Sequence, residues 1–354
     1  MTDRGHQYDY PPVVDLSIAE EDLHSYEAAA RHLNSGRFDI VSLQHEFGIF
    51  GGVDGDNILD LIDDLRRPLV TTMHTILSSP GLHQRYVTER IAGSSERVIV
   101  MSEKGAWMLA ERYRVDPQKI DVIAHGIPDV PIVAPDIIKA KRGFIGRTVI
   151  LTFGLLSPNK GIEVMIDAMP AVLKSYPDAL YIVLGATHPN LLRTDGENYR
   201  TGLVGRVDKL GITSNVLFID QFIERRDLLE YIAMCDLYVT PYLSEEQMTS
   251  GTLAYSFGLG RPIVSTPYWH ATELLAGGRG ELVPFGDSKA TGDAITALLA
   301  NPARCRAISQ RNYSESRSMT WRCVGEQYVD VFADVLGGRT GRREARPAAA
   351  LNAA

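Results

Sequence analysis

Cysteine is scarce in this sequence, and its number and spacing exclude two common ways of stabilising a fold. The chain of 354 residues has three cysteines, Cys235, Cys305 and Cys323. An odd and scattered set is neither a disulfide framework nor a group with metal-ligand spacing. This usage fits a reducing compartment, so we expect a cytoplasmic protein without a metal site.

Long apolar runs and excess positive charge are also absent. No stretch of 18 apolar residues could span a bilayer, and the first twelve residues have no apolar core typical of a signal peptide. The net charge is −8, which argues against a broad nucleic-acid or anionic-membrane surface. A local basic pocket and a peripheral membrane contact stay open. The composition, with 45% hydrophobic and 23% charged residues, is typical of a soluble globular protein.

Apolar strands alternate with helical segments in two halves of the chain, which predicts an α/β fold of two doubly wound, Rossmann-like parallel sheets facing a cleft. The predicted strands are 38–43, 69–72, 98–101 and 119–123 in the first half, and 148–153, 179–184, 216–219, 237–240, 262–265 and 280–283 in the second. The predicted parts are a first domain (1–133), a linker (134–146), a second domain (147–320), a C-terminal helix crossing back to the first domain (321–336) and a disordered tail (337–354).

The stretch 244–266 is predicted to run from a loop through a helix and a glycine turn into a buried strand. Ser250 and Thr252 are residue types that cap helix starts, and Gly251 allows close approach to a ligand. A helix starting here would offer free N–H groups and a positive dipole end to an anion. The alternative is an ordinary loop-helix-strand unit that binds nothing.

The sequence GLLSPNKG at 154–161 lies between a predicted strand and a predicted helix. Lys160 could reach a phosphate there while backbone N–H groups of the turn cradle it. The turn lacks the Gly-Lys-Ser/Thr of a nucleotide-hydrolysing P-loop, which excludes that class. The alternative for Lys160 is a solvated side chain near a helix start.

Polar residues follow two strands of the first half, where α/β proteins place their chemistry. Gln44, His45 and Glu46 follow one strand and His74 follows the next. A histidine and a carboxylate brought together there could act as acid, base or partners of sugar hydroxyls, although a structural role for each histidine is the alternative. The Asp-x-Asp at 54–56 resembles a metal site, but a turn and a helix cap explain it.

Four segments of the second half resemble the family 4 glycosyltransferases, retaining enzymes of the GT-B architecture. In chain order they are GLLSPNKG, YIVLGA, EEQMTSGTLAYSFGLGRPIVST and ELLAGGRGELVPFGD. The first half resembles the acceptor-side domain of this family more loosely, through VSLQHEFGIFGG, TTMHTIL and VIAHGIP. The resemblance implies transfer of a sugar, with retention, from a nucleotide diphosphate sugar to a hydroxyl of a carbohydrate or glycoconjugate. It implies no cofactor and no obligatory metal.

The resemblance also implies roles for individual residues. Lys160 matches the lysine that holds the diphosphate, and His74 is the best match for a strand-end histidine near the transferred sugar. The implied catalytic residues are His74, Lys160, Gln247 and Glu46. The implied donor-binding residues are Gly154, Asn159, Lys160, Gly161, Gln247, Ser250, Gly251, Thr252, Tyr255 and Glu273, the last at a helix start. The implied acceptor-side residues are His45, Glu46 and Gly48.

The chain departs from the family pattern at several points. Leu155 stands where the family has an arginine, and Gln247 and Tyr255 stand where it has two glutamates eight positions apart. The family's opening strand with its Gly-rich loop is not found, so we expect the first domain to be shortened. These departures favour the alternative of a catalytically impaired GT-B relic that binds carbohydrate or nucleotide. A nucleotide-sugar epimerase or a phosphorylase of the same architecture is a further alternative.

Overall fold

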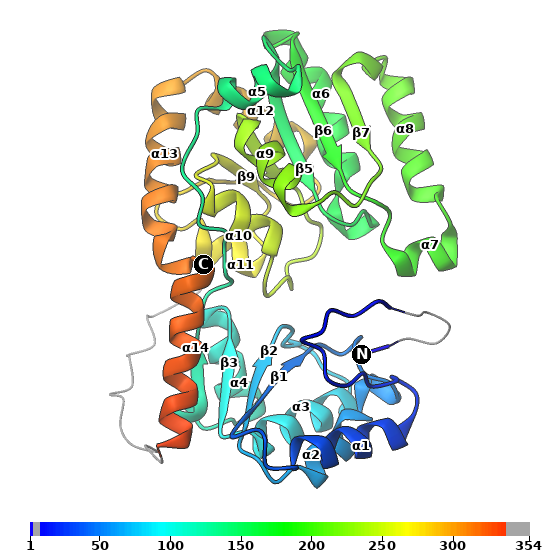
Figure 1. Ribbon diagram of the computed structural model, residues 1–354. Helices are drawn as coiled ribbons and strands as arrows, with labels where there is room; N and C mark the ends of the chain where they lie inside the picture. Colours follow the sequence, from blue (N-terminus) through cyan, green and yellow to red (C-terminus); the bar gives the residue numbers. More distant parts are fainter. Residues whose placement is uncertain (3–7, 338–354) are drawn as a thin grey trace. The chain divides into compact units, whose positions relative to one another are not determined.

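The computed structural model describes residues 1–2 and 8–337, which form two compact units, each built around one parallel sheet (Figure 1). The first unit combines residues 1–124 with the chain from residue 324 onward, and the second comprises residues 125–323. The prediction of an α/β fold with two parallel sheets is therefore confirmed. The tail predicted at 337–354 lies, from residue 338 on, outside the described residues.

The first unit has a four-stranded parallel sheet with the strand order β1-β2-β3-β4. The strands are β1 (Val41–His45), β2 (Leu69–Met73), β3 (Arg97–Val100) and β4 (Ile120–Val122). The helices are α1 (Leu23–Leu33), α2 (Ile58–Asp64), α3 (Leu82–Ser94), α4 (Glu103–Tyr113) and α14 (Trp321–Leu336), with 3₁₀ turns η1 (Val53–Gly55) and η2 (Pro117–Lys119). Val70, Ile99 and Ile123 of the sheet region pack against Val324 and Val331 of α14. The C-terminal helix therefore completes the core of the first unit.

The second unit has a six-stranded parallel sheet with the order β10-β9-β8-β5-β6-β7. The strands are β5 (Thr148–Phe153), β6 (Ala179–Leu184), β7 (Val216–Ile219), β8 (Leu237–Thr240), β9 (Ile263–Ser265) and β10 (Glu281–Leu282). The helices are α5 (Pro135–Arg142), α6 (Ile162–Ser175), α7 (Pro189–Asp195), α8 (Asn198–Leu210), α9 (Arg225–Met234), α10 (Gly251–Gly258), α11 (Trp269–Leu274), α12 (Ser288–Leu299) and α13 (Pro302–Glu315). The 3₁₀ turns are η3 (Pro158–Lys160), η4 (Thr213–Asn215) and η5 (Ser316–Met319). Every residue of β6 is buried, as expected for a parallel strand with helices on both faces.

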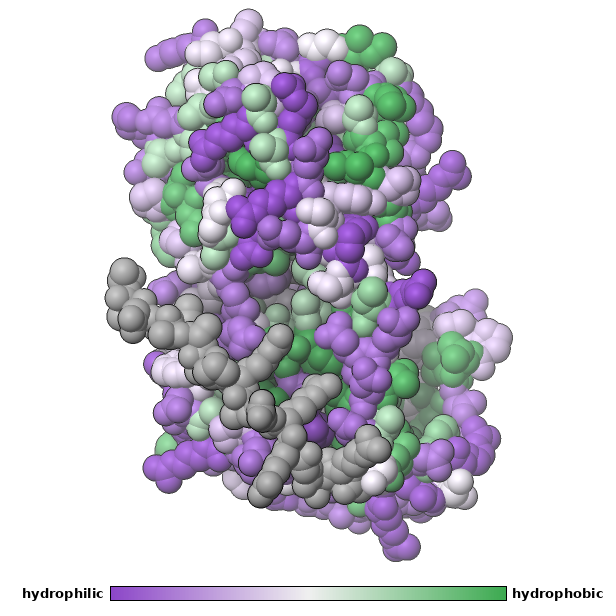
Figure 2. Space-filling model, turned by 90° about the vertical axis from the view of Figure 1, so that its left-hand side faces the viewer, coloured by the Kyte–Doolittle hydropathy of each residue, from purple (hydrophilic) through white to green (hydrophobic). Residues whose placement is uncertain are grey.

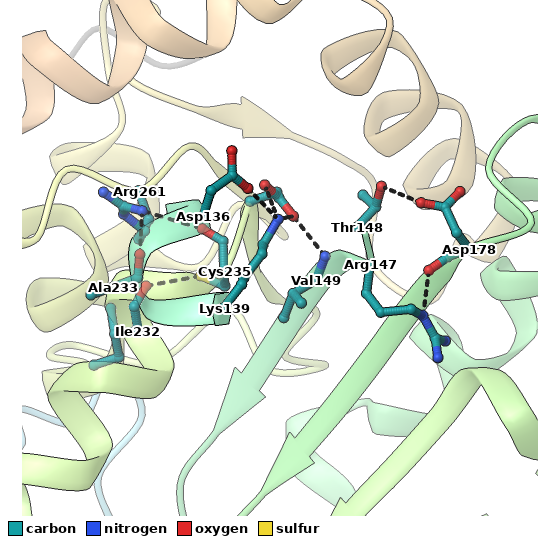
Figure 3. A network of polar contacts seen from close by, with 11 residues as sticks. Asp136, Lys139, Arg147, Thr148, Val149, Asp178, Ile232, Ala233, Cys235 and Arg261 are labelled. Carbon is teal, nitrogen blue, oxygen red and sulfur yellow. Dashed lines mark hydrogen bonds and ion pairs between the residues drawn. The ribbon is translucent and has the colours of Figure 1, made fainter. Parts of the chain in front are cut away.

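The residues predicted as a linker, 134–146, contain helix α5, which belongs to the second unit. Pro135 stands at the start of this helix and Gly143, in the left-handed conformation, ends it. Lys139, labelled in Figure 3, is 5% exposed. Its Nζ donates to both carboxylate oxygens of Asp236, at 2.8 and 2.7 Å. Asp236 also accepts from the Val149 backbone N–H at 2.6 Å. Proline and basic residues, read as linker signals, here start a helix and anchor it beside β5.

The surface of each unit is mainly hydrophilic on the face that Figure 2 presents, with hydrophobic residues in smaller groups between the polar ones. This pattern is expected when helices cover both faces of a parallel sheet and turn their charged sides to water. Among the helices within residues 1–2 and 8–337, none is both long enough and apolar enough to cross a membrane.

Candidate functional site

Glycines shape the turn that carries Lys160 at the carboxyl end of β5. The strand ends at Phe153, and Gly154 follows with a φ of +125°. The chain then passes through η3 to Gly161, whose φ is +61° and which precedes α6. A Cβ atom at Gly161 would lie 2.0 Å from the Pro241 carbonyl oxygen, so only glycine fits this crossing. Lys160 is thereby placed beside the loop that follows β8.

The side chain of Lys160 is held by Tyr242, which follows β8. The Lys160 Nζ donates to the Tyr242 hydroxyl at 2.9 Å and lies 4.0 Å from the centroid of its ring. Among the described residues, no carboxylate lies within ion-pair distance of this ammonium group. Burial opposes ionisation of the phenol, but the charge and hydrogen bond of Lys160, together with the hydroxyls of Thr252 and Ser250, outweigh it, so the pKa of Tyr242 lies below its ordinary value.

Hydroxyl groups connect this lysine to the start of α10. The Thr252 Oγ1 lies 3.1 Å from the Tyr242 hydroxyl and 3.1 Å from the Ser250 Oγ. Ser250 is the N-cap of α10, and its Oγ accepts from the Leu253 backbone N–H at 3.3 Å. A cation and a helix N-terminus therefore share one connected polar network at the carboxyl ends of β5 and β8. This arrangement is suited to binding an anion such as a phosphate.

Two histidines stand beside the same helix start. His270 of α11 is 4% exposed, and its Nδ1 accepts from the Ser250 backbone N–H at 2.9 Å. Burial, with a smaller contribution from His125, lowers the pKa of His270 to about 3, so its imidazole is neutral. The Nδ1 of His125 donates to the Gly126 carbonyl at 2.8 Å. A Cβ atom at Gly251 would lie 3.0 Å from the His125 Nε2, so this glycine makes room for the ring.

In the first unit the structure brings Gln44 and His74 together, as the neighbouring parallel strands β1 and β2 predict. The His74 Nε2 lies 2.9 Å from the Gln44 Oε1, and the Gln44 Nε2 donates to the Thr72 Oγ1 at 3.2 Å. Burial lowers the pKa of His74 and the charge of Glu46 opposes this shift. The Glu46 Oε1 accepts from the Thr75 hydroxyl at 3.3 Å. His74 and Glu46 therefore both lie at the carboxyl ends of the neighbouring strands β1 and β2.

His45 lies in the interior of the first unit, although its sequence position predicts that it lines the acceptor side. Its side chain is 1% exposed, and its ring lies 5.2 Å from the ring of Phe47 and 5.9 Å from that of Phe50. Burial, with a smaller contribution from His74, lowers its pKa to about 4. His45 is thus a neutral core residue. Gly48 is exposed, and a Cβ atom there would meet nothing within 4 Å.

The two carboxylates of the Asp-x-Asp at 54–56 both contact the imidazole of His83. The two ring nitrogens of His83 lie 3.2 Å from the Asp54 carboxylate and 3.3 Å from that of Asp56. A Cβ atom at Gly52 would lie 2.1 Å from the Asp56 Oδ1, as expected of a tight turn. Within the described ranges, no group of three or more His, Cys, Asp or Glu side chains is placed to hold a metal ion.

Two family models match the chain, and together they span most of it. The model described as "Glycosyltransferase Family 4" matches residues 2–129, and the model described as "Glycosyl transferases group 1" matches residues 147–301. The chain belongs to the family 4 glycosyltransferases.

Individual family members share about a quarter of their residues with this chain. The D-inositol 3-phosphate glycosyltransferase of Segniliparus rotundus is 25% identical over 300 residues, which cover 78% of this chain and 63% of the relative. The phosphatidyl-myo-inositol mannosyltransferase of Mycobacterium leprae is 27% identical over 192 residues, covering 54% of this chain and 47% of the relative. The chain therefore spans less than two thirds of the length of these curated relatives.

A solved structure supports the GT-B fold of this family member. The crystal structure of Anabaena Alr3699/HepE in complex with UDP superimposes with a TM-score of 0.73, covering 90% of this chain and 85% of the other at 18% identity. At this identity the similarity supports a shared fold and no finer property.

Two of the residues at which this family member departs from the pattern, Gln247 and Tyr255, lie just ahead of α10 and within it. The Gln247 Nε2 donates to the Thr249 carbonyl at 2.7 Å, so this amide stabilises its own loop. The Tyr255 ring lies 6.1 Å from the His125 ring. Glu273 is in the last turn of α11, which begins at Trp269, so the predicted helix start at Glu273 is wrong. The extended Tyr268 ahead of Trp269 marks the true start.

Three residues of this region were not among the site residues predicted from the sequence. Tyr242, His125 and His270 all lie beside Lys160 or the start of α10. His125 and His270 follow predicted strands, which is the signal by which His74 was chosen. Tyr242 follows a predicted strand as well, but its contact with Lys160 depends on β8 lying next to β5.

Proposed function

We propose that this chain is a retaining glycosyltransferase that moves a sugar from a nucleotide diphosphate sugar to a hydroxyl of a carbohydrate-type acceptor. The observation that carries the proposal is the joined cation and helix start, in which Lys160 and Thr252 both bond the Tyr242 hydroxyl. Negative charge develops on the diphosphate as the sugar bond breaks, and groups fixed in advance stabilise it without reorganising. Gly154, Asn159 and Gly161 shape the turn that presents Lys160 to this charge.

The proposed reaction needs no enzyme nucleophile, metal or cofactor. The bond between the anomeric carbon and the diphosphate oxygen breaks while the acceptor hydroxyl forms a new bond on the same face of the sugar. The departing phosphate oxygen takes the proton of that hydroxyl, so retention follows without a covalent intermediate. On the first unit we assign sugar contact to His74 and acceptor contact to Glu46. The scarcity of cysteine supports a cytoplasmic site of action.

The known proteins suggest which compounds to test first. The Anabaena structure contains UDP, so UDP and UDP-sugars are the first donors to try. The Segniliparus relative is named for D-inositol 3-phosphate, so inositol phosphates are the first acceptors. GDP and ADP, with their sugars, complete the donor set.

The test compares Lys160→Ala with Lys174→Ala, an exposed lysine in the last turn of α6. We expect Lys160→Ala to lower turnover by about 10²–10³-fold, as loss of one preorganised electrostatic group does, and Lys174→Ala to leave turnover unchanged. Release of the nucleoside diphosphate with and without acceptor gives the rate. The anomeric configuration of the product, read by NMR, tests retention.

One observation favours a second candidate, a relic that binds nucleotide without catalysis. Gln247 and Tyr255 supply no carboxylate, and the Gln247 amide is engaged with its own loop. UDP binding that is lost in Lys160→Ala, with no turnover for any donor and acceptor, would support the relic. Turnover that Lys160→Ala leaves unchanged would contradict both candidates.

A further inference from the structure

Tyr242 is more tightly fixed than its position in a loop after β8 requires. Its side chain is 1% exposed and its ring stacks on that of Tyr268, with centroids 4.9 Å apart. Its backbone carbonyl accepts from the Thr266 hydroxyl at 2.6 Å. Its own hydroxyl lies 3.1 Å from the Thr252 Oγ1. The ring, the backbone and the hydroxyl are each held by a different neighbour.

We propose that Tyr242 is a positioning residue that presents Lys160 to the diphosphate as an immobilised cation whose charge is not neutralised. The inference rests on the proposed function, because it assigns a new residue to the same donor site. The hydroxyl of Tyr242 accepts from the Lys160 Nζ at 2.9 Å, and the electron-rich face of its ring lies 4.0 Å from that nitrogen. Tyr242 thus acts on the substrate through Lys160.

A buried phenol suits this task better than a carboxylate would. A carboxylate at the same distance would pair with the ammonium group and cancel most of the charge that the diphosphate needs. A phenol that keeps its proton accepts a hydrogen bond without adding a negative charge, so the charge of Lys160 is left for the ligand. Holding a long, flexible lysine before the ligand arrives also lowers the entropy lost on binding.

Tyr242 also joins the cation to the start of α10. Because an ammonium group can only donate, the Tyr242 oxygen accepts from Lys160, and the phenol proton is left to point at the Thr252 Oγ1. The Tyr242 side chain then positions both the Lys160 ammonium group and Thr252 at the start of α10, the two groups that we propose face the diphosphate. The lowered pKa of Tyr242 agrees with this geometry: although burial opposes it, the Lys160 charge stabilises the ionised phenol.

A double-mutant cycle separates positioning through Lys160 from a structural role. The unmodified chain and the variants Tyr242→Phe, Lys160→Met and the double variant are titrated with UDP and with inorganic pyrophosphate by calorimetry. Phenylalanine keeps the ring, the stacking and the buried volume and removes only the hydroxyl. We expect Tyr242→Phe alone to weaken binding about tenfold, and to cause no further loss in the Lys160→Met background. Equal losses in both backgrounds, or no loss in either, would overturn the proposal.

The matched control is Tyr181→Phe in β6, which removes another buried phenol hydroxyl of the second unit, one that donates to the Thr152 Oγ1 at 3.0 Å. We expect this variant to bind UDP as the unmodified chain does. A loss equal to that of Tyr242→Phe would mean that any buried hydroxyl of the second unit has this effect, and would also overturn the proposal.

A second measurement does not need a ligand and so separates this inference from the proposed donor site. Tyrosine ionisation is followed by near-ultraviolet absorbance, and the signal of Tyr242 is obtained by subtracting the titration of Tyr242→Phe. We expect Lys160→Met to move this ionisation to higher pH. If UDP does not bind but the ionisation moves, the proposed donor fails and the Tyr242–Lys160 coupling stands. An ionisation that Lys160→Met leaves in place would refute the coupling.

Discussion

Acidification from pH 7 to pH 5 should destabilise both units of the chain, because a neutral histidine is buried in the described part of each unit. His45 in the first unit is 1% exposed and His270 in the second is 4% exposed. Burial lowers their pKa values from 6.5 to about 4 and about 3, respectively. The unfolded chain takes up these protons near pH 6.5 and the folded chain does not. The stabilisation is therefore complete above pH 6.5 and is lost as the pH falls towards the folded-state values.

The magnitude follows from the distance below the unfolded pKa. Each pH unit in this window changes the free energy of unfolding by about 1.4 kcal/mol per group. At pH 5, about 1.5 units below the unfolded value, each histidine should cost its unit about 2 kcal/mol relative to pH 7. Carboxylates and other groups also titrate on acidification, so the contribution of a histidine must be taken as the difference between the unmodified chain and a variant.

The variants are His45→Phe, which suits a site between Phe47 and Phe50, and His270→Gln. Stability at pH 7 and pH 5 is measured by urea unfolding, with peptide-resolved hydrogen exchange to follow each unit separately. His45→Phe should remove about 2 kcal/mol of acid sensitivity from the first unit only, and His270→Gln the same from the second. The exposed His24→Gln serves as control and should change neither. If His45→Phe and the unmodified chain lose equal stability between pH 7 and pH 5, the reasoning is refuted.

Two further predictions concern the second unit, and both are read from the free energy of unfolding in denaturant. Lys139→Met should lower it by about 3–5 kcal/mol, since the Asp236 carboxylate loses its buried partner. Adding Asp236→Asn should restore most of this loss. Equal stability of the single and double variants would contradict the prediction. Gly185→Ala should cost at least about 2 kcal/mol, because its φ is +146° and a Cβ atom would lie 2.0 Å from the Gly154 carbonyl oxygen. The control Gly202→Ala, in an exposed part of α8 with nothing within 4 Å, should instead stabilise by about 0.5–1 kcal/mol.

The strands of the second sheet were predictable because their signal is local. The predicted ranges 148–153, 179–184, 216–219 and 237–240 coincide with β5, β6, β7 and β8. Each is an almost continuous apolar run with turn residues on both sides. β6 and β8 are buried along their whole length, as expected of inner parallel strands, and β7 is apolar although it lies at the edge of the sheet and is partly exposed. An apolar run of four to six residues between turn residues predicts a strand more readily than a helix.

The first strand was predicted at 38–43, whereas β1 is Val41–His45. β1 is an edge strand of its sheet and only partly buried, and its sequence VSLQH alternates apolar and polar residues. Successive side chains of a strand alternate between its faces, which places Leu43 and His45 on the same side. Ending the predicted strand at Leu43 turned His45 into a loop residue, and its interior position was missed. Extending the alternation by two residues, towards Phe47, was the signal available.

The contact between Lys160 and Tyr242 could not be predicted from local pattern. The two residues are 82 positions apart, and they meet only because β8 pairs with β5. The sequence predicts the existence of both strands, but their order in the sheet depends on how the helices between them pack. A site assembled from the ends of several strands is therefore predictable in its residue types and not in its pairings.

Because residues 247 and 255 are neutral in this chain, nucleotide binding and sugar transfer can depend on different residues. In the proposed site, binding of the diphosphate depends on a cation and on backbone N–H groups. Lys160, held by Tyr242, and the helix start capped by Ser250 would supply these without a carboxylate at positions 247 or 255. Orientation of the sugar hydroxyls in the proposed reaction depends on groups that accept hydrogen bonds. There Gln247 offers a neutral amide oxygen in place of a carboxylate, on a side chain whose Nε2 is bonded to its own loop. Affinity for a nucleoside diphosphate and turnover of its sugar should therefore be set by different residues in this chain. Gln247→Glu, which restores a carboxylate, should change the rate of transfer more than it changes the Kd for UDP.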